Sequence, residues 1–205
     1  MPPIPESRGL PSEEEVRRLV TAILERVTAA ELPPASSADG GLPAPDAPAA
    51  VAIGADHGGY RLKERIAADL RERGVEVRDC GTGGTDPVDY PDFAHRVGWL
   101  VADGDCSVGI LVDGAGIGSC IAANKVPGVR AATCWDVSSA RNSREHNHAN
   151  VLVLGAGLIG ENLAREIVEA WLSTPWGGDR HARRVAKITE IERRYLAREE
   201  VGAAP

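Results

Sequence analysis

Aromatic residues are scarce in this chain: four tryptophans, three tyrosines and one phenylalanine make up 4% of its 205 residues. A protein that binds single-stranded nucleic acid stacks the bases on aromatic side chains, and this composition offers few such platforms. Basic residues are also in the minority, because 23 lysines and arginines stand against 30 aspartates and glutamates. The resulting formal net charge of -7 argues against a nucleic-acid binder, which would present a basic face.

Long apolar runs are missing as well. No run approaches the roughly 20 residues of a membrane-spanning helix, and the N-terminus lacks the basic stretch and apolar core of a signal peptide. The four cysteines are widely spaced and form no C-x-x-C pair: Cys80, Cys106, Cys120 and Cys134. We therefore expect reduced thiols in a cytoplasmic protein, with no nucleic-acid or membrane partner and no metal site.

The first part of the chain predicts a helix and a linker. Residues 12–32 begin with an S-x-x-E capping box and carry an apolar stripe at helical spacing: Val16, Leu19, Val20, Ile23 and Val27. Residues 33–50 contain five prolines and two glycines without apolar periodicity, which is typical of a flexible tether. A short helix needs a surface to cover its stripe, either its own domain, a sister subunit or another protein.

The pattern after the tether is that of an α/β domain over residues 51–200. Short apolar runs predict strands at 51–53, 75–79, 108–112, 129–134 and 151–154. They alternate with helical patterns at 60–73, 90–102, 137–146 and 160–172. Such alternation predicts a Rossmann-like three-layer sandwich in which helices cover both faces of a five-stranded parallel sheet.

Three glycine-containing loops follow predicted strands, and in such sheets ligands bind beyond the carboxyl ends of the strands. The loops are G-A-D-H-G-G-Y, D-G-A-G-I-G-S and G-A-G-L-I-G. We expect one crevice to be shared by the polar residues of the first two loops: Asp56, His57, Asp113 and Ser119. Each of these residues taken alone also fits ordinary turn chemistry. Asp113, beside backbone amides that suit an anion, indicates proton transfer on a bound anion.

Two further patterns bear on the ligand. Gly155 to Gly160 spells G-x-G-x-x-G, but a dinucleotide fingerprint belongs to the first strand of its unit, so a tight turn is the better interpretation. Arg180 and Arg184 lie in an arginine-rich cluster near the end of the chain. Arginine forks suit phosphate oxygens, whereas the alternative is an exposed basic helix face.

Several motifs of residues 51–196 occur together in one order. They are G-A-D-H-G-G-Y-R-L-K, D-Y-P, I-L-V-D-G-A-G-I-G-S-C-I-A-A-N-K-V-P-G-V-R-A, R-E-H-N-H-A-N-V-L and R-H-A-R-R. In this combination the chain resembles the ribose-5-phosphate isomerase B family. The resemblance implies a homodimer or tetramer with each active site built from two subunits and with no metal or cofactor. It also implies interconversion of aldose and ketose phosphates through an enediolate.

The resemblance carries roles to individual residues. His146 matches the histidine that opens the furanose ring, and Asn147 matches the neighbour that holds the enediolate. Substrate contacts are expected at Asp56, His57, Tyr90 and Ser119, and phosphate contacts at Arg180 and Arg184. The amides of Gly114, Gly116 and Gly118 would form the oxyanion hole, where fixed donors have their largest effect.

Two positions depart from the commonest family pattern. Asp113 stands where many members have cysteine, and Ala115 stands where they have threonine or serine. Other members take the base from a glutamate at the position of Ser119. We expect Asp113 to be the base, because a carboxylate can remove a proton next to a carbonyl.

The same motifs leave several substrates open. Ribose 5-phosphate is the first expectation, and the alternatives are allose or galactose 6-phosphate, or a sugar-phosphate-binding protein with impaired catalysis. The N-terminal residues 1–32 with the linker at 33–50 resemble an encapsulation peptide of bacterial microcompartments. That resemblance implies a cargo enzyme of the microcompartment lumen, with shell proteins bound through residues 12–32.

Overall fold

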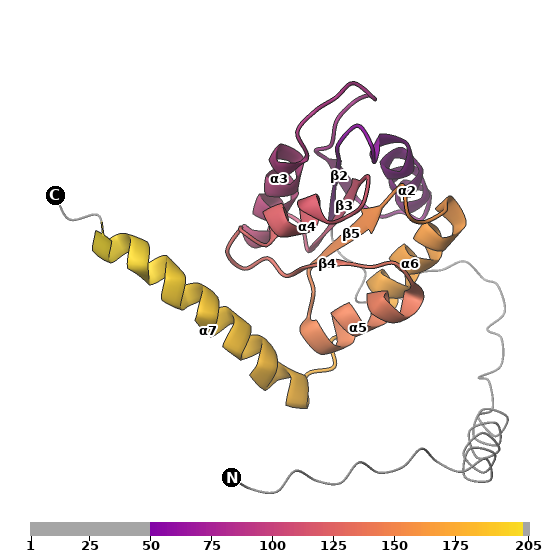
Figure 1. Ribbon diagram of the computed structural model, residues 1–205. Coiled ribbons are helices and arrows are strands. Elements are labelled where there is room, and N and C mark those ends of the chain that lie inside the picture. The colour runs from indigo at the N-terminus through magenta and orange to yellow at the C-terminus, as the bar shows by residue number, and fades with distance from the viewer. Residues whose placement is uncertain (1–49, 203–205) are drawn as a thin grey trace, which may run out of the picture. The chain divides into compact units, whose positions relative to one another are not determined.

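The computed structural model describes residues 50–202, with side chains as far as Leu196. The helix predicted at 12–32 and nearly all of the linker lie outside these residues. In chain order the elements are β1 (Val51–Ala55), α2 (Tyr60–Glu72), β2 (Val77–Asp79), α3 (Tyr90–Ala102), β3 (Val108–Asp113), α4 (Gly118–Ala123), β4 (Ala131–Thr133), α5 (Val137–Asn147), β5 (Val151–Gly155), α6 (Glu161–Ser173) and α7 (Asp179–Gly202). Figure 1 shows this arrangement.

The five strands form one parallel sheet in the order β2-β1-β3-β5-β4. The predicted Rossmann-like α/β class with a five-stranded parallel sheet is therefore confirmed. The chain leaves β1 toward one edge of the sheet and returns to β3 on the other side of β1. The loops after β1 and β3 thus diverge at the switch point, where sheets of this type bind their ligands.

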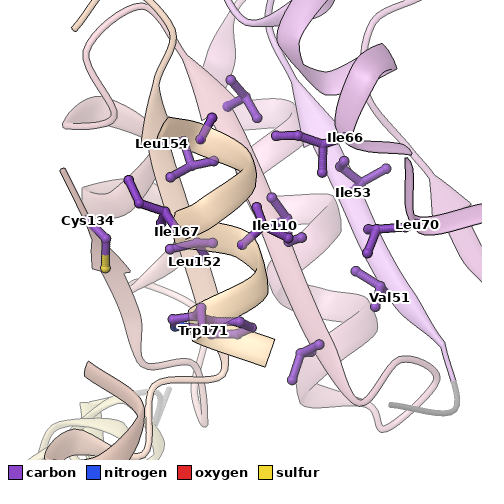
Figure 2. Packing of buried hydrophobic residues seen from close by; sticks show 14 of the residues in the cluster. Val51, Ile53, Ile66, Leu70, Ile110, Cys134, Leu152, Leu154, Ile167 and Trp171 are labelled. Atoms are coloured by element: carbon purple, nitrogen blue, oxygen red, sulfur yellow. The ribbon is translucent and has the colours of Figure 1, made fainter. Parts of the chain in front are cut away.

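One face of the sheet is covered by α2, α5 and α6. Alternate residues of the central strands point to this side, among them Ile53, Ile110 and Leu152. Figure 2 shows Ile167 and Trp171 of α6 and Ile66 and Leu70 of α2 packed against them. Because side chains alternate across a strand, the next residues along each strand are left for the opposite face.

The opposite face is covered by α3 and α4, and glycine brings α3 close to the strands. Ala52, Leu111 and Val153 belong to one buried cluster on this side with residues of α3 and α4. A Cβ on Gly109 would lie 2.6 Å from Val97 Cγ1, so only glycine allows this approach. Strands buried on both faces read as continuous apolar runs, which is why the sequence predicted them well.

The main differences from the sequence prediction lie at turns and at the C-terminus. β2 begins at Val77 rather than Val75, because the Val75 amide still donates to Leu70 O at the end of α2. β4 is shorter than predicted, since Val129 closes a turn onto Val126. The 24-residue α7 was not predicted at all. No helix between residues 50 and 202 is long and apolar enough to cross a membrane.

A buried lysine ties α2 to β2. The Lys63 side chain is 2% exposed, and its Nζ lies 2.5 Å from Asp79 Oδ2 and 2.5 Å from Glu64 Oε1. Burial alone would lower the pKa of Lys63, but the hydrogen bonds to Asp79 and Glu64 outweigh it and raise the pKa. Asp79 Oδ1 also accepts from Gly81 N at 2.9 Å, so this carboxylate fixes the turn after β2.

We expect Asp79→Ala to lower the free energy of unfolding by about 2 kcal/mol, because it leaves a buried ammonium short of an acceptor. Chemical denaturation measures the loss. The matched control is Asp105→Ala, which removes a half-exposed partner of Arg78 and should cost less than about 1 kcal/mol. Equal losses in the two variants would contradict a structural role for the Lys63 pair.

Candidate active site

The loop after β1 holds Asp56 and His57 beside β3. A Cβ on Gly59 would lie 2.1 Å from Val112 O, so glycine is required where α2 begins. The Asp56 side chain is buried, and its Oδ1 accepts from Gly59 N at 3.0 Å. His57 is exposed, and its Nδ1 accepts from Val88 N at 3.2 Å. A neutral His57 therefore carries its proton on Nε2, where it can donate to a ligand.

Asp113 ends β3 and folds back onto its own loop. Its Oδ1 accepts hydrogen bonds from Ala115 N at 2.9 Å and from Gly116 N, and its Oδ2 accepts from Ser119 N at 3.0 Å. The residue is only 5% exposed. The carboxylate thus fills the nest of amides that the sequence suggested for an anionic ligand.

These contacts leave Asp113 one place for a further proton. A carboxylate has about four acceptor sites, two on each oxygen. Oδ1 uses both of its sites, whereas Oδ2 has only the described bond to Ser119 N. Oδ2 is therefore the atom that can accept a proton, while the Gly116 amide is already engaged and does not reach a substrate oxygen in this conformation.

The Asp113 loop is also held from two neighbouring strands. Thr133 Oγ1, at the end of β4, donates to Gly116 O at 2.6 Å. Beyond β5, Ala156 N donates to Asp113 O at 2.8 Å and Gly157 N donates to Gly114 O at 2.9 Å. The amides of the 155–160 loop that would face a pyrophosphate are thus occupied, which confirms a tight turn there.

Tyr90 and Ser119 border the same loop. A Cβ on Gly118 would lie 2.6 Å from Tyr90 Cζ and 3.0 Å from its hydroxyl, so the phenol covers the start of α4. Tyr90 is 40% exposed, so part of it remains open to solvent beside the loop. Ser119 is buried, and its described contact to Asp113 is through its backbone amide.

The other predicted residues form a second group around the end of α5. The rings of His146 and His181 stack with centroids 4.2 Å apart, and Arg180 Nε donates to His181 Nε2 at 3.1 Å. Asn147 is the last residue of α5, and Arg184 lies on the first turns of α7. Figure 1 shows the start of α7 beside α5.

The register of the sheet separates the two groups. Asp113 pairs with Gly155 at the carboxyl end of the sheet, whereas α5 ends just before Val151, which pairs with Gly109. Four strand residues separate Asp113 from Gly109. At about 3.3 Å each, they put some 13 Å along the strand between Asp113 and the end of the sheet where α5 ends. None of the hydrogen bonds, ion pairs or ring contacts described for residues 50–196 joins the two groups. One chain therefore brings together the Asp56 and Asp113 loops, but not Asp113 and His146.

Burial sets the protonation of several neighbouring groups. It raises the pKa of Cys80 to about 11 and also raises that of Cys134, so these thiols remain protonated near neutral pH. Burial lowers the pKa of His148, with Arg130 and Arg144 acting in the same direction. Within residues 50–196, no three histidine, cysteine, aspartate or glutamate side chains cluster as metal ligands.

Some contributors were not assigned a role from the sequence. Thr133 has no motif of its own, since a hydroxyl at a strand end fits any exposed turn. His181 is part of the R-H-A-R-R motif, but the sequence assigned a role only to the arginines of that motif, as phosphate ligands. Asn142, whose Nδ2 lies 2.8 Å from His146 Nδ1, precedes it by one helical turn, a spacing that links side chains on one face.

A family model described as ribose/galactose isomerase matches residues 51–188. The chain belongs to this family. It is thus an isomerase, and the ribose/galactose isomerase fold accounts for all the elements from β1 to the first turns of α7.

Individual relatives agree with this assignment. Ribose-5-phosphate isomerase B of Escherichia coli is 49% identical over 144 residues, which are 70% of this chain and 97% of that protein. The D-erythrulose-4-phosphate isomerase of Pectobacterium atrosepticum is 44% identical, covering 69% and 94%. The structure of Clostridium thermocellum ribose-5-phosphate isomerase B superposes with a TM-score of 0.71 at 53% identity, covering 71% and 99%.

Proposed function

We propose that this isomerase interconverts ribose 5-phosphate and ribulose 5-phosphate, with Asp113 Oδ2 as the base. The support is the remaining acceptor site of that buried oxygen at the sheet switch point. A relative with 49% sequence identity and a protein of solved structure with 53% sequence identity both carry the name ribose-5-phosphate isomerase B.

The reaction follows from this placement. Oδ2 takes the proton from C2 of the open-chain aldose, and the electron pair forms the C1–C2 double bond of an enediolate. The negative charge on O1 is stabilised by the amides of Gly114 and Gly118 and by donors from His57 and Tyr90. Return of the proton to C1 and loss of the O2 proton, which passes to O1, give the ketose.

The cyclic sugar must first open, and His146 performs this step in our proposal. Asn142 Nδ2 can only donate, so His146 Nδ1 accepts and the neutral ring carries its proton on Nε2. Nε2 donates this proton to the ring oxygen as the bond from C1 breaks, and it recovers a proton from the O1 hydroxyl. Asn147 holds the enediolate, and Arg180 and Arg184 bind the phosphate.

Because His146 and Asp113 occupy opposite ends of the sheet, we propose that a second copy of the chain completes each site. An apolar groove of about 830 Å³ lies between α7 and the α/β body. It is lined by Pro127, Val129 and Ala132 and by the half-exposed Ile188, Ile191 and Leu196 of α7. A second copy in a homodimer, or in a tetramer of such dimers, would cover this surface.

The activity is tested on purified full-length protein with a panel of four-, five- and six-carbon aldose phosphates, including allose and galactose 6-phosphates. We expect ribose 5-phosphate to have the highest kcat/KM. Asp113→Ala should lower kcat about 100-fold or more, because the base is lost. Asp103→Ala, an exposed aspartate at the end of α3, is the control and should keep full activity.

Other results would change the assignment. A preference for the four-carbon sugar phosphate would instead assign this protein the activity for which the Pectobacterium relative is named. Sugar-phosphate binding without turnover, and without solvent exchange at C2, would favour a binding protein. Full activity of Asp113→Ala would remove Asp113 as the base.

The shared site is tested by mixing two inactive variants, Asp113→Ala and His146→Ala, after unfolding and refolding them together. If each site takes Asp113 from one copy and His146 from the other, half of the dimers pair different variants and each has one intact site. The mixture should regain about a quarter of the wild-type activity. A mixture as inactive as its parents, with mixed dimers detected by mass spectrometry, would mean that one chain supplies both residues.

We also propose that residues 12–32 bind microcompartment shell proteins and bring the enzyme into the lumen. The support is the apolar stripe of this segment and its proline-rich tether, placed ahead of an isomerase domain that begins at β1. Deleting residues 1–49 should leave kcat and KM unchanged and abolish co-purification with shells. Shell loading that survives the deletion, or activity that is lost with it, would refute this role.

A further inference from the structure

His181 covers one face of the His146 ring. The two rings are nearly parallel, with an interplanar angle of 6° and centroids 4.2 Å apart. His181 is 6% exposed, whereas the His146 side chain is 34% exposed. His146 therefore rests on a buried ring and presents its other side to solvent.

Hydrogen bonds fix how each ring is turned. His146 Nδ1 accepts from Asn142 Nδ2 at 2.8 Å, and His181 Nε2 accepts from Arg180 Nε at 3.1 Å. Each ring thus has one nitrogen held by a donor. For His146 this leaves Nε2, which lies 3.7 Å from Glu145 Oε1, to exchange a proton with a sugar.

The segment before α7 holds His181 in place. Trp176 stacks on His148 with centroids 4.7 Å apart and meets His181 at 6.4 Å. Gly177 N donates to Glu145 O at 3.0 Å, and a Cβ on Gly177 would lie 2.8 Å from that oxygen. The last turn of α5 is therefore clamped by residues 176–181, which are distant from it in sequence.

The charge state suits a stacked pair. Burial lowers the pKa of His181, and the neighbouring His146, Arg180 and Arg184 lower it further, while Glu145 acts in the opposite direction. An uncharged His181 adds no further positive charge beside Arg180 and Arg184, so the stack buries no cation against His146.

We propose that His181 is a positioning residue that acts through His146: its flat ring fixes the plane of His146 so that Nε2 faces the ring oxygen of the cyclic sugar phosphate. This inference rests on the proposed function, because it concerns the ring-opening step alone. Proton transfer between C1 and C2 does not depend on the stack.

The two sugars separate these steps chemically. Ribose 5-phosphate closes to a furanose through O4, so its conversion requires ring opening. Ribulose 5-phosphate cannot close in this way, because the O5 that would attack its carbonyl carries the phosphate. Exchange of its C1 proton with deuterated solvent therefore reports proton transfer without ring opening.

The experiment compares His181→Leu, which fills the space without a flat ring, with His181→Phe, which keeps the ring. We expect His181→Leu to lower kcat on ribose 5-phosphate roughly 10- to 100-fold, since a misplacement of about 1 Å costs that much. Its exchange at C1 of ribulose 5-phosphate should remain within about twofold of wild type. His181→Phe should recover most of the lost turnover, and His95→Ala on the exposed face of α3 is the matched control.

The outcomes distinguish this inference from the function on which it rests. Equal loss of both reactions in His181→Leu, or equal behaviour of the Leu and Phe variants, would overturn the positioning role. Retention of both reactions in His181→Leu would overturn it as well. A wild-type protein that neither converts ribose 5-phosphate nor exchanges the ribulose 5-phosphate proton would instead refute the proposed function.

Discussion

The hydrogen bonds that Asp113 accepts from the amides of Ala115, Gly116 and Ser119 are the interaction on which the site depends. They set the path of the chain from the end of β3 into α4, with Gly116 at a φ of 74° that suits glycine. The same bonds decide which carboxylate oxygen can take a proton. One side chain therefore both shapes the loop and determines which of its own oxygen atoms remains open to a ligand.

The second constraint is the direction of the helices in a parallel sheet. A helix that follows a strand starts at the carboxyl end of the sheet and ends at the amino end, so residues on its last turn are carried away from the strand-end loops. His146 lies on the last turn of α5, while Asp113 ends β3. Symmetric pairing of two chains can overcome this separation, because it can place the amino end of one sheet beside the carboxyl end of the other.

Much of the fold was predictable because the central strands are buried on both sides. The runs around Ile53, Ile110 and Leu152 have no exposed face. The strands at Ile110 and Leu152 extend one residue past their predicted ends, and the strand at Ile53 extends two. α7 was not predicted, because its apolar residues are spread among charges and its first turns read as a phosphate site. Contacts between site residues that are distant in sequence could not be predicted either. The sequence shows R-H-A-R-R and R-E-H-N, but not that His181 stacks on His146.

Asp113 and Ala115 fit a single electrostatic arrangement. An aspartate brings a full charge and four acceptor sites to the end of β3, and three of them are met by amides of its own loop. A hydroxyl on residue 115 would find Oδ1 already saturated, so Ala115 gives up no bond to that oxygen. The same arrangement explains why sequence reasoning could regard Asp113 either as a base or as a turn residue. The loop uses it as a turn residue on Oδ1, whereas Oδ2 accepts only one described hydrogen bond, from Ser119 N.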